Sequence, residues 1–267
     1  MKKIILSILL FSATILGVKA QDIAYPQGKF FTIGVGLPMS FSNDKAISPL
    51  WYLGSGIEFK VGFLKNTATS CNRFDIVIGS IKEKPVLKPK PKFSYSGADF
   101  SNMKFAHSYY KKVGGNIHQD VLVGGQFCVQ VALRSHEATG NNRLGFMLFT
   151  GLKAGAMTRG HHDAKWSYTS NVNIPIIGML GRPTYIGLPD IEFKVSPGPM
   201  NFFKNVKLVT LNKYRAIDVN IEVNQQQKAW KFNRYTGNFS YQYTPSPKGK
   251  PLKMGQYSLG YDFMVKR

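Results

Sequence analysis

Residues 51–63 read WYLGSGIEFKVGF, a segment in which two kinds of side chain alternate. The odd-numbered positions, from Trp51 to Phe63, are apolar apart from one serine. The even-numbered positions that follow the tyrosine hold glycine or charge, and the two charges are Glu58 and Lys60. Successive side chains of a β-strand point to opposite faces. The segment therefore predicts a strand with one apolar face and one polar, glycine-rich face.

The length of the apolar face favours a strand that crosses a membrane. Its twelve steps from Trp51 to Phe63, at about 3.3 Å each, extend about 40 Å along the strand. A strand tilted by about 40° then covers about 30 Å of depth, close to the apolar band of an outer-membrane barrel. Trp51 and Phe63 would lie in the two aromatic girdles that border this band. A soluble strand with one wet face explains the alternation but not its length.

The same alternation recurs along the chain and predicts an all-β fold. The proline-rich stretch 165–211 is the exception, because proline donates no hydrogen bond to a sheet ladder and favours loops, edges and bulges. We expect an antiparallel transmembrane β-barrel of about ten to twelve strands, with an even number typical of bacterial barrels. The further candidate strands are 31–37, 74–79, 120–134, 144–154, 191–195, 217–223, 239–243 and 257–265.

The first twenty residues have the pattern of a secretory signal peptide. Lys2 and Lys3 give a positive start, residues 4–18 are mostly apolar, and Ala20 precedes a polar residue. This predicts export with cleavage after Ala20, and leaves residues 21–267 as a single β-barrel domain. Beyond the signal the sequence has no apolar run long enough for a membrane-spanning helix. A membrane location would therefore require a closed barrel, which leaves no backbone group unpaired in lipid.

The charge of the chain points to anionic partners outside the cytoplasm. Removing the three lysines of residues 1–20 leaves 32 basic against 14 acidic residues, a formal charge of +18. An exported chain rarely meets nucleic acid, so we expect none as a partner. Lipid headgroups, lipopolysaccharide phosphates and acidic glycans are better candidates, and a solvated lysine-rich surface is the alternative.

The last strand candidate carries a family resemblance. Tyr257, Leu259, Tyr261, Phe263 and Val265 form an aromatic-rich face that alternates with polar and small residues. In this alternating last strand, and in the order of its segments from signal peptide to last strand, the chain resembles Gram-negative outer-membrane β-barrel proteins. The resemblance implies that the barrel assembly machinery reads the last strand, and that outer-membrane lipids, lipopolysaccharide and other envelope proteins are partners. The chain departs from the pattern by continuing past the aromatic residues to a basic end.

Two groups of charged residues are candidate functional positions. Glu58 and Lys60 share the polar face of residues 51–63, so in a barrel they would face the lumen, with Asp75 and Arg134 as possible partners on neighbouring strands. A structural polar network and a selectivity filter are the two interpretations. The second group lies in residues 82–92, a proline-rich segment that predicts an extended outer loop in contact with lipopolysaccharide phosphates, or simply a solvated loop. Its lysines are Lys82, Lys84, Lys88, Lys90 and Lys92.

Signals for catalysis are weak. His107 and Ser108 resemble the His-x-Ser motif of outer-membrane lipid hydrolases, but here they are adjacent, and a serine nucleophile needs its histidine within hydrogen-bond reach. No phosphate loop or zinc-finger spacing appears, so we expect no catalytic, cofactor or metal site. The sequence does not decide whether Cys71 and Cys128 form a disulfide, which export would permit.

Three functions follow from these patterns. The favoured one is a non-enzymatic outer-membrane barrel, which acts as a narrow pore, a surface or a component of an envelope assembly. The second is a soluble periplasmic or secreted binding protein with a β-sandwich or lipocalin-like fold. The third is an outer-membrane lipid hydrolase.

Overall fold

The computed structural model describes residues 26–45, 50–86, 97–116, 118–136, 144–162, 165–182, 206–228, 230–244 and 251–267. The predicted signal peptide, the strand expected at 191–195 and the lysines Lys88, Lys90 and Lys92 lie outside these residues.

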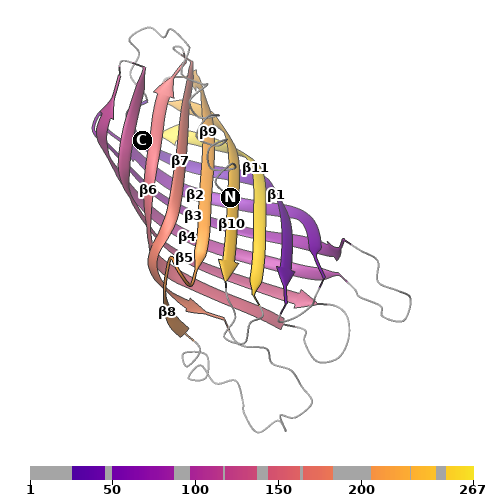
Figure 1. Cartoon of the computed structure of the whole chain (residues 1–267). Helices are drawn as coiled ribbons and strands as arrows, with labels where there is room; N and C mark the ends of the chain where they lie inside the picture. The colour runs from indigo at the N-terminus through magenta and orange to yellow at the C-terminus, as the bar shows by residue number, and fades with distance from the viewer. Residues whose placement is uncertain are drawn as a thin grey trace, which may run out of the picture.

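The described chain consists of β-strands joined by turns (Figure 1). It contains no helix with the length and apolar character needed to cross a membrane. The strands are β1 (Gly28–Asp44), β2 (Tyr52–Asn66), β3 (Ser70–Pro85), β4 (Ala98–Gly115), β5 (Gln119–His136), β6 (Leu144–His161), β7 (Trp166–Gly181), β8 (Val206–Thr210), β9 (Arg215–Lys228), β10 (Lys231–Thr244) and β11 (Leu252–Lys266).

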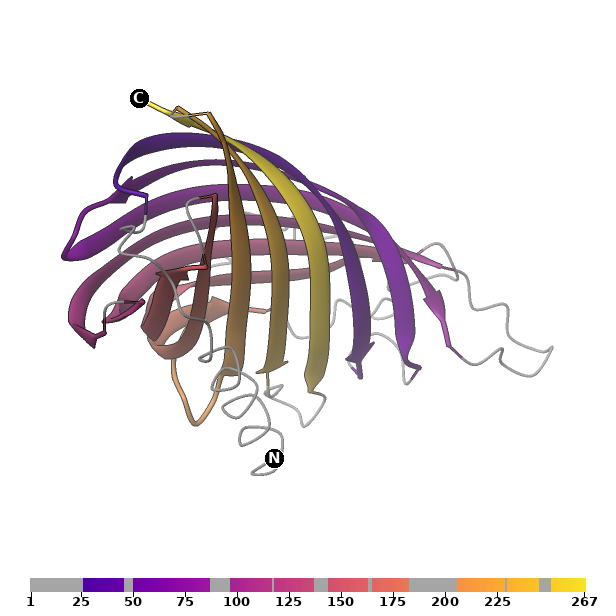
Figure 2. The same cartoon turned by 90° about the horizontal axis from the view of Figure 1, so that it is seen from above.

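Ten of these strands close into an antiparallel barrel. Strands β1 to β7 pair in sequence order, β7 pairs with β9, and β9, β10 and β11 follow in order. The first and last strands then pair along their whole length, from Phe30 opposite Lys266 to Asp44 opposite Leu252. Figure 2 shows the wall from above, with β1 and β11 side by side. The prediction of an antiparallel barrel with about ten to twelve strands is confirmed.

Strand β8 lies outside this closed circuit. It pairs with the end of β7, Ile177–Gly181, whereas β9 pairs with Trp166–Asn173 of the same strand. Between β8 and β9 the N–H groups of Lys213 and Tyr214 both donate to the carbonyl oxygen of Thr210 at 2.9 Å. This turn leaves the Tyr214 side chain buried inside the barrel.

The proline-rich stretch is irregular, as its composition predicts. Pro175 lies within β7, and the register between β6 and β7 shifts beside it, between Leu152 and Lys153. A register shift of this kind accommodates a residue that donates no hydrogen bond to the ladder. The strand expected at 217–223 is confirmed as part of β9.

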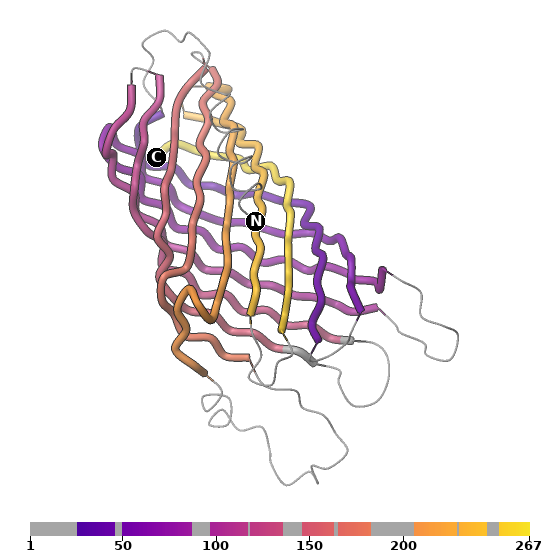
Figure 3. Tube along the Cα trace, viewed as in Figure 1, coloured from indigo at the N-terminus to yellow at the C-terminus, as the bar shows by residue number. Residues whose placement is uncertain are grey.

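The two ends of the barrel differ in the length of their connections. At the end that holds the start of β1 and the end of β11, the connections are residues 67–69, 116–118, 162–165 and 229–230. At the other end they are residues 45–51, 86–97, 137–143, 182–205 and 245–251. We call these the short-turn end and the long-loop end (Figure 3). In outer-membrane barrels short turns face the periplasm and longer loops face the outside.

The alternation in the sequence separates the two faces of the wall. In β2, Leu53, Ile57, Phe59 and Phe63 are exposed and point outward, while the even-numbered positions between them are less exposed. In β11, Leu259 is 66% exposed, and Ser258 beside it is buried. A water-soluble sheet would bury such a face, so a continuous apolar exterior is suited to lipid.

Outward aromatic rings lie toward both ends of the wall. Nearer the long-loop end, the Phe41 ring lies 6.4 Å from Trp51 and 6.1 Å from Tyr257, measured between ring centroids. Nearer the short-turn end, the rings of Phe31 and Phe63 are 5.1 Å apart. These positions match the two girdles expected for a barrel strand.

The lysine-rich loop begins later than the sequence indicated. β3 continues to Pro85, so Lys82 and Lys84 are strand residues with exposed, outward side chains, and the prediction of a loop from residue 82 is wrong for this part. Glu83 between them points inward and is buried, because its carboxylate pairs with Arg134 in the lumen. This inward contact favours continuation of the strand.

Candidate functional site

The inward side chains fill the barrel in three layers. Two apolar layers lie toward the two ends, and a layer of ion pairs lies between them. The short-turn layer consists of Phe30, Leu64, Cys71, Tyr110, Leu122, Met157, Phe232 and Met264. The long-loop layer consists of Ile81, Phe100, Ala106, Cys128, Ala132, Met147, Phe149, Leu180, Val209, Tyr214, Leu252 and Met254.

The long-loop layer is centred on a pair of stacked rings. Phe149 from β6 and Tyr214 from the turn before β9 lie with their ring centroids 4.4 Å apart and an interplanar angle of 26°. The Tyr214 hydroxyl donates to the Gln242 side-chain oxygen at 3.1 Å. Both rings are almost fully buried in this part of the lumen.

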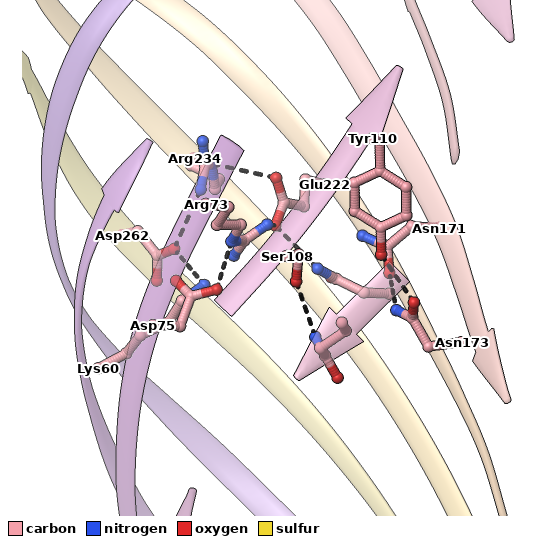
Figure 4. Close-up of polar contacts among 12 residues, drawn as sticks. Lys60, Arg73, Asp75, Ser108, Tyr110, Asn171, Asn173, Glu222, Arg234 and Asp262 are labelled. Atoms are coloured by element: carbon pink, nitrogen blue, oxygen red, sulfur yellow. Dashed lines mark hydrogen bonds and ion pairs between the residues drawn. The ribbon is translucent and has the colours of Figure 1, made fainter. Parts of the chain in front are cut away.

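The middle layer is organised around Glu222 on β9 (Figure 4). Its carboxylate pairs with Arg73 on β3, and its Oε2 atom lies 3.4 Å from Nε of Arg234 on β10. The Asn220 amide donates to the same carboxylate at 2.8 Å. The side chains of Glu222 and Arg234 are 2% and 0% exposed. Charges this deeply buried need partners, because an unpaired buried charge is costly.

Asp262 on β11 extends this network to the neighbouring wall. Lys60 Nζ donates to Asp262 Oδ2 at 2.9 Å, and Arg234 Nη1 lies 3.9 Å from the same oxygen. Arg73 also pairs with Asp75, two residues along its own strand. We call Lys60, Arg73, Asp75, Glu222, Arg234 and Asp262 the central network.

A second group of charges lies beside the central network. Asp218 on β9 accepts hydrogen bonds from Lys104 on β4 at 3.3 Å and from Lys153 on β6 at 2.5 Å. The Tyr110 hydroxyl donates to Asn173 Oδ1 at 2.7 Å, which joins β4 to β7. These contacts bridge strands that are not neighbours in the sheet.

A cavity of about 140 Å³ remains between the apolar layers. Glu58, Lys60, Asp75, Lys104 and Asp218 are among the side chains that line it. With the rest of the central network and Lys153, the charged groups around it are five carboxylates and five cations, so their formal charges cancel. A small polar cavity of this kind is suited to a few water molecules.

The lumen residues expected from the sequence all face inward, but with different partners. Lys60 contacts Asp262, and Glu58 accepts a hydrogen bond from Ser258. Asp75 contacts Arg73 rather than either of them. The suggested pairing of Glu58 or Lys60 with Asp75 or Arg134 is therefore wrong.

Arg134 belongs to a separate polar cluster at the long-loop end. Its Nη2 atom donates to Glu83 Oε1 at 3.2 Å, and its Nε atom lies 3.0 Å from Oε2. Ser40 donates to the same carboxylate at 2.7 Å. The cluster joins β1, β3 and β5, and it lies on the long-loop side of the middle layer.

A buried arginine lies at the short-turn end. Arg159 on β6 donates to the carbonyl oxygens of Thr67 and Ala68 in the β2–β3 turn and of Ser70 at the start of β3, at 2.8, 2.9 and 3.3 Å. Its Nε atom lies 3.0 Å from Asp120 Oδ2. The turn is thereby held against a strand three places away around the wall.

The remaining sequence candidates are not brought together. His107 faces outward, with Nε2 3.0 Å from Asn72 Oδ1, whereas Ser108 faces the lumen and accepts a hydrogen bond from Gln126 at 3.0 Å. The two side chains lie on opposite faces of β4, so they do not form a nucleophile–base pair. Cys71 and Cys128 are both free and lie in different apolar layers.

Sequence reasoning missed most of the charged lumen residues. Arg73, Lys153, Glu222 and Arg234 were not singled out, although each has an outward apolar or aromatic neighbour in its strand. The alternation that selected Glu58 selects these residues too, once it is applied to every strand. The identity of their partners is not present in that pattern.

One of the comparisons with known proteins, that with solved structures, supports the barrel fold. No protein-family model matches the sequence, and no curated protein matches it either. Among solved structures, the outer membrane protease OmpT from Escherichia coli has a TM-score of 0.57 at 7% identity, over 91% of this chain and 97% of that chain. The transport unit of the autotransporter AIDA-I from Escherichia coli has a TM-score of 0.47 at 9% identity, over 90% of both chains.

A third solved structure, the translocator domain of the autotransporter NalP from Neisseria meningitidis, has a TM-score of 0.41 at 8% identity, over 96% of this chain and 94% of that chain. The closed wall and the likeness to OmpT show that this chain has the fold of a Gram-negative outer-membrane β-barrel. Identities this low show the fold alone.

Proposed function

We propose that the chain is a non-enzymatic integral outer-membrane barrel with a lumen closed to solutes, so that it acts through its surface in the envelope. The observation that carries this proposal is the filling of the lumen: two buried apolar layers enclose a charge-balanced layer with a cavity of about 140 Å³. A conducting pore needs a continuous polar path, and here it would have to cross both apolar layers.

The decisive experiment is conductance in planar bilayers with the folded full-length protein. Insertion is verified first, by resistance to carbonate extraction from vesicles and by a heat-dependent shift on a denaturing gel. We expect the inserted protein to produce no stable conductance steps. Regular steps at neutral pH and ordinary salt would overturn the closed lumen and favour the narrow pore.

We further propose that the chain is exported and cleaved after Ala20. The pattern of residues 1–20 supports this, and the outward apolar face of the wall is suited to the membrane that an exported barrel enters. N-terminal sequencing of protein from washed outer membranes should begin at Gln21. A protein that carbonate extracts from those membranes would instead be the soluble periplasmic or secreted binding protein.

The proposed partners follow from the same placement. β11, with its outward Tyr257, Leu259 and Tyr261, is the strand that the barrel assembly machinery would read. Lys82 and Lys84 face outward near the long-loop end, where lipopolysaccharide phosphates would lie if this end faces outside. Replacing both with Gln should weaken lipopolysaccharide binding to the folded barrel without changing its heat-dependent gel shift.

The lipid hydrolase has little support. Ser108 and His107 lie on opposite faces of β4, and Ser108 is buried in the lumen, away from lipid. The test is release of fatty acid from phospholipid vesicles by wild type and by Ser108→Ala. Release by the wild type that disappears in the variant would establish the enzyme and refute this proposal.

A further inference from the structure

The outward surface at the short-turn end carries a continuous row of basic side chains. They come from five neighbouring strands, in the sheet order β2, β1, β11, β10 and β9. Arg267 directly follows β11, and its N–H donates to the carbonyl oxygen of Lys29 at 2.8 Å, so it continues the ladder beside β1. We call this row the basic arc, and it consists of Lys65, Lys29, Arg267, Lys231 and Lys228.

The arc places like charges directly opposite each other. Lys29 is the register partner of Lys65, and Lys228 is the register partner of Lys231. Directly opposite like charges destabilise a sheet. Among the described residues, none of the arc members forms an ion pair with an aspartate or glutamate, although the buried arginines of the lumen do. The repulsion within the arc is therefore not relieved by the barrel itself.

Aromatic rings locate the arc at the depth of lipid headgroups. Lys231 Nζ lies 4.8 Å from the centroid of the Phe263 ring. Lys65 follows two residues after Phe63, whose ring packs on Phe31 outside the wall. Aromatic side chains collect at the membrane interface, and lysine stems extend from there to the charged headgroups.

The opposite rim lacks this arrangement. There the outward Lys82 is the register partner of Asp99, and Lys84 is the partner of the apolar Leu53. Both lysines thus lack a basic cross-strand partner, and one of them faces an acid. The uninterrupted basic row is a property of the short-turn end among the described strands.

We propose that the basic arc binds the phosphate groups of anionic phospholipids, such as phosphatidylglycerol, in the leaflet that faces the short-turn end. A phosphate between Lys29 and Lys65, or between Lys228 and Lys231, converts a repulsive pair into two favourable contacts. The occupant is a lipid rather than a protein or a glycan because the arc points outward and adjoins the aromatic girdle. This inference rests on the membrane placement proposed above and extends it to a specific lipid class.

The experiment uses the folded full-length barrel in detergent with equal amounts of phosphatidylglycerol and phosphatidylcholine. Native mass spectrometry then counts the lipids that each barrel retains. The test variant is Lys29→Gln/Lys65→Gln/Lys231→Gln. The matched control, Lys45→Gln/Lys207→Gln/Lys213→Gln, removes three exposed lysines from the long-loop half. A heat-dependent gel shift establishes that every protein is folded, which separates a failure of the barrel itself from a failure of the lipid site.

We expect wild type to retain phosphatidylglycerol over phosphatidylcholine. The test variant should lose this preference by at least about tenfold, because each basic residue near an anionic surface contributes to attraction. The control should keep the preference. Equal retention of the two lipids by wild type, or an equal loss in the control, would overturn the proposal. So would a test variant that keeps its lipid preference but no longer binds acidic fragments of the cell wall.

Discussion

Arg73 on β3 and Glu222 on β9 form an ion pair across the full width of the barrel. Five strand-to-strand steps separate β3 from β9 through β2, β1, β11 and β10, which is half of the ten-strand circuit. The same carboxylate contacts Arg234 on the adjacent strand. Opposite walls are thus joined through the middle of the lumen.

Replacement of Glu222 by Gln should destabilise the barrel strongly. The change leaves Arg73 and Arg234 buried without their shared carboxylate, and removal of one partner from a buried ion pair costs about 3–5 kcal/mol. Unfolding by urea in lipid vesicles, followed by tryptophan fluorescence, measures the loss. Asp99→Asn is the matched control, because Asp99 is exposed on β4 and its loss should cost under about 1 kcal/mol. Equal effects of the two changes would contradict the structural importance of the central network.

The Tyr214 side chain should contribute mainly by packing. Tyr214→Ala removes a ring stacked on Phe149 and leaves a cavity, so we expect a loss of about 3–5 kcal/mol. Tyr214→Phe keeps the ring and removes only the hydrogen bond to Gln242, a loss of about 1 kcal/mol. Urea unfolding of both variants in vesicles distinguishes the two contributions. A phenylalanine variant as unstable as the alanine variant would mean that the hydroxyl, not the ring, holds the long-loop layer together.

The stability cost of a charge on the outer face should depend on its depth in the membrane. Phe59 lies in the middle of β2 and Leu53 near its long-loop end, and both are exposed. We expect Phe59→Arg to cost about 2–4 kcal/mol and Leu53→Arg about 0–1 kcal/mol, because arginine is unfavourable at the bilayer midplane and tolerated near the interface. The folded fraction in vesicles across a urea series measures both. Equal costs would contradict the tilt and placement of β2 in the membrane.

The two cysteines should remain reduced and unreactive in the folded barrel. Cys71 and Cys128 are buried in different apolar layers, and thiols shielded in this way react slowly. A maleimide reagent should label neither cysteine in the folded protein within minutes, and both after unfolding in urea and detergent. No label after unfolding without reductant, and two labels once reductant is added, would reveal a disulfide and contradict the separation of the layers.

The architecture was largely predictable because side-chain alternation is a local property. Residues 51–63 indicated an outward apolar face, and the structure places Leu53, Ile57 and Phe59 on the outside. Residues 82–92 predict a loop, because lysine and proline favour loops. Its first part is strand, since buried Glu83 pairs with Arg134 from β5, a contact 51 residues away that no local pattern contains.

The sequence alone determined which face of each strand meets lipid and which meets the lumen, because the two-residue period of a strand assigns every side chain to a side. The tertiary structure decided which lumen charges meet. Glu58 and Lys60 could be assigned to the interior, but their partners Ser258 and Asp262 follow from closure of β1 against β11. The Arg73–Glu222 contact depends on strand number, tilt and stagger, which set the distance between opposite walls. These are properties of the closed barrel, and no single strand contains them.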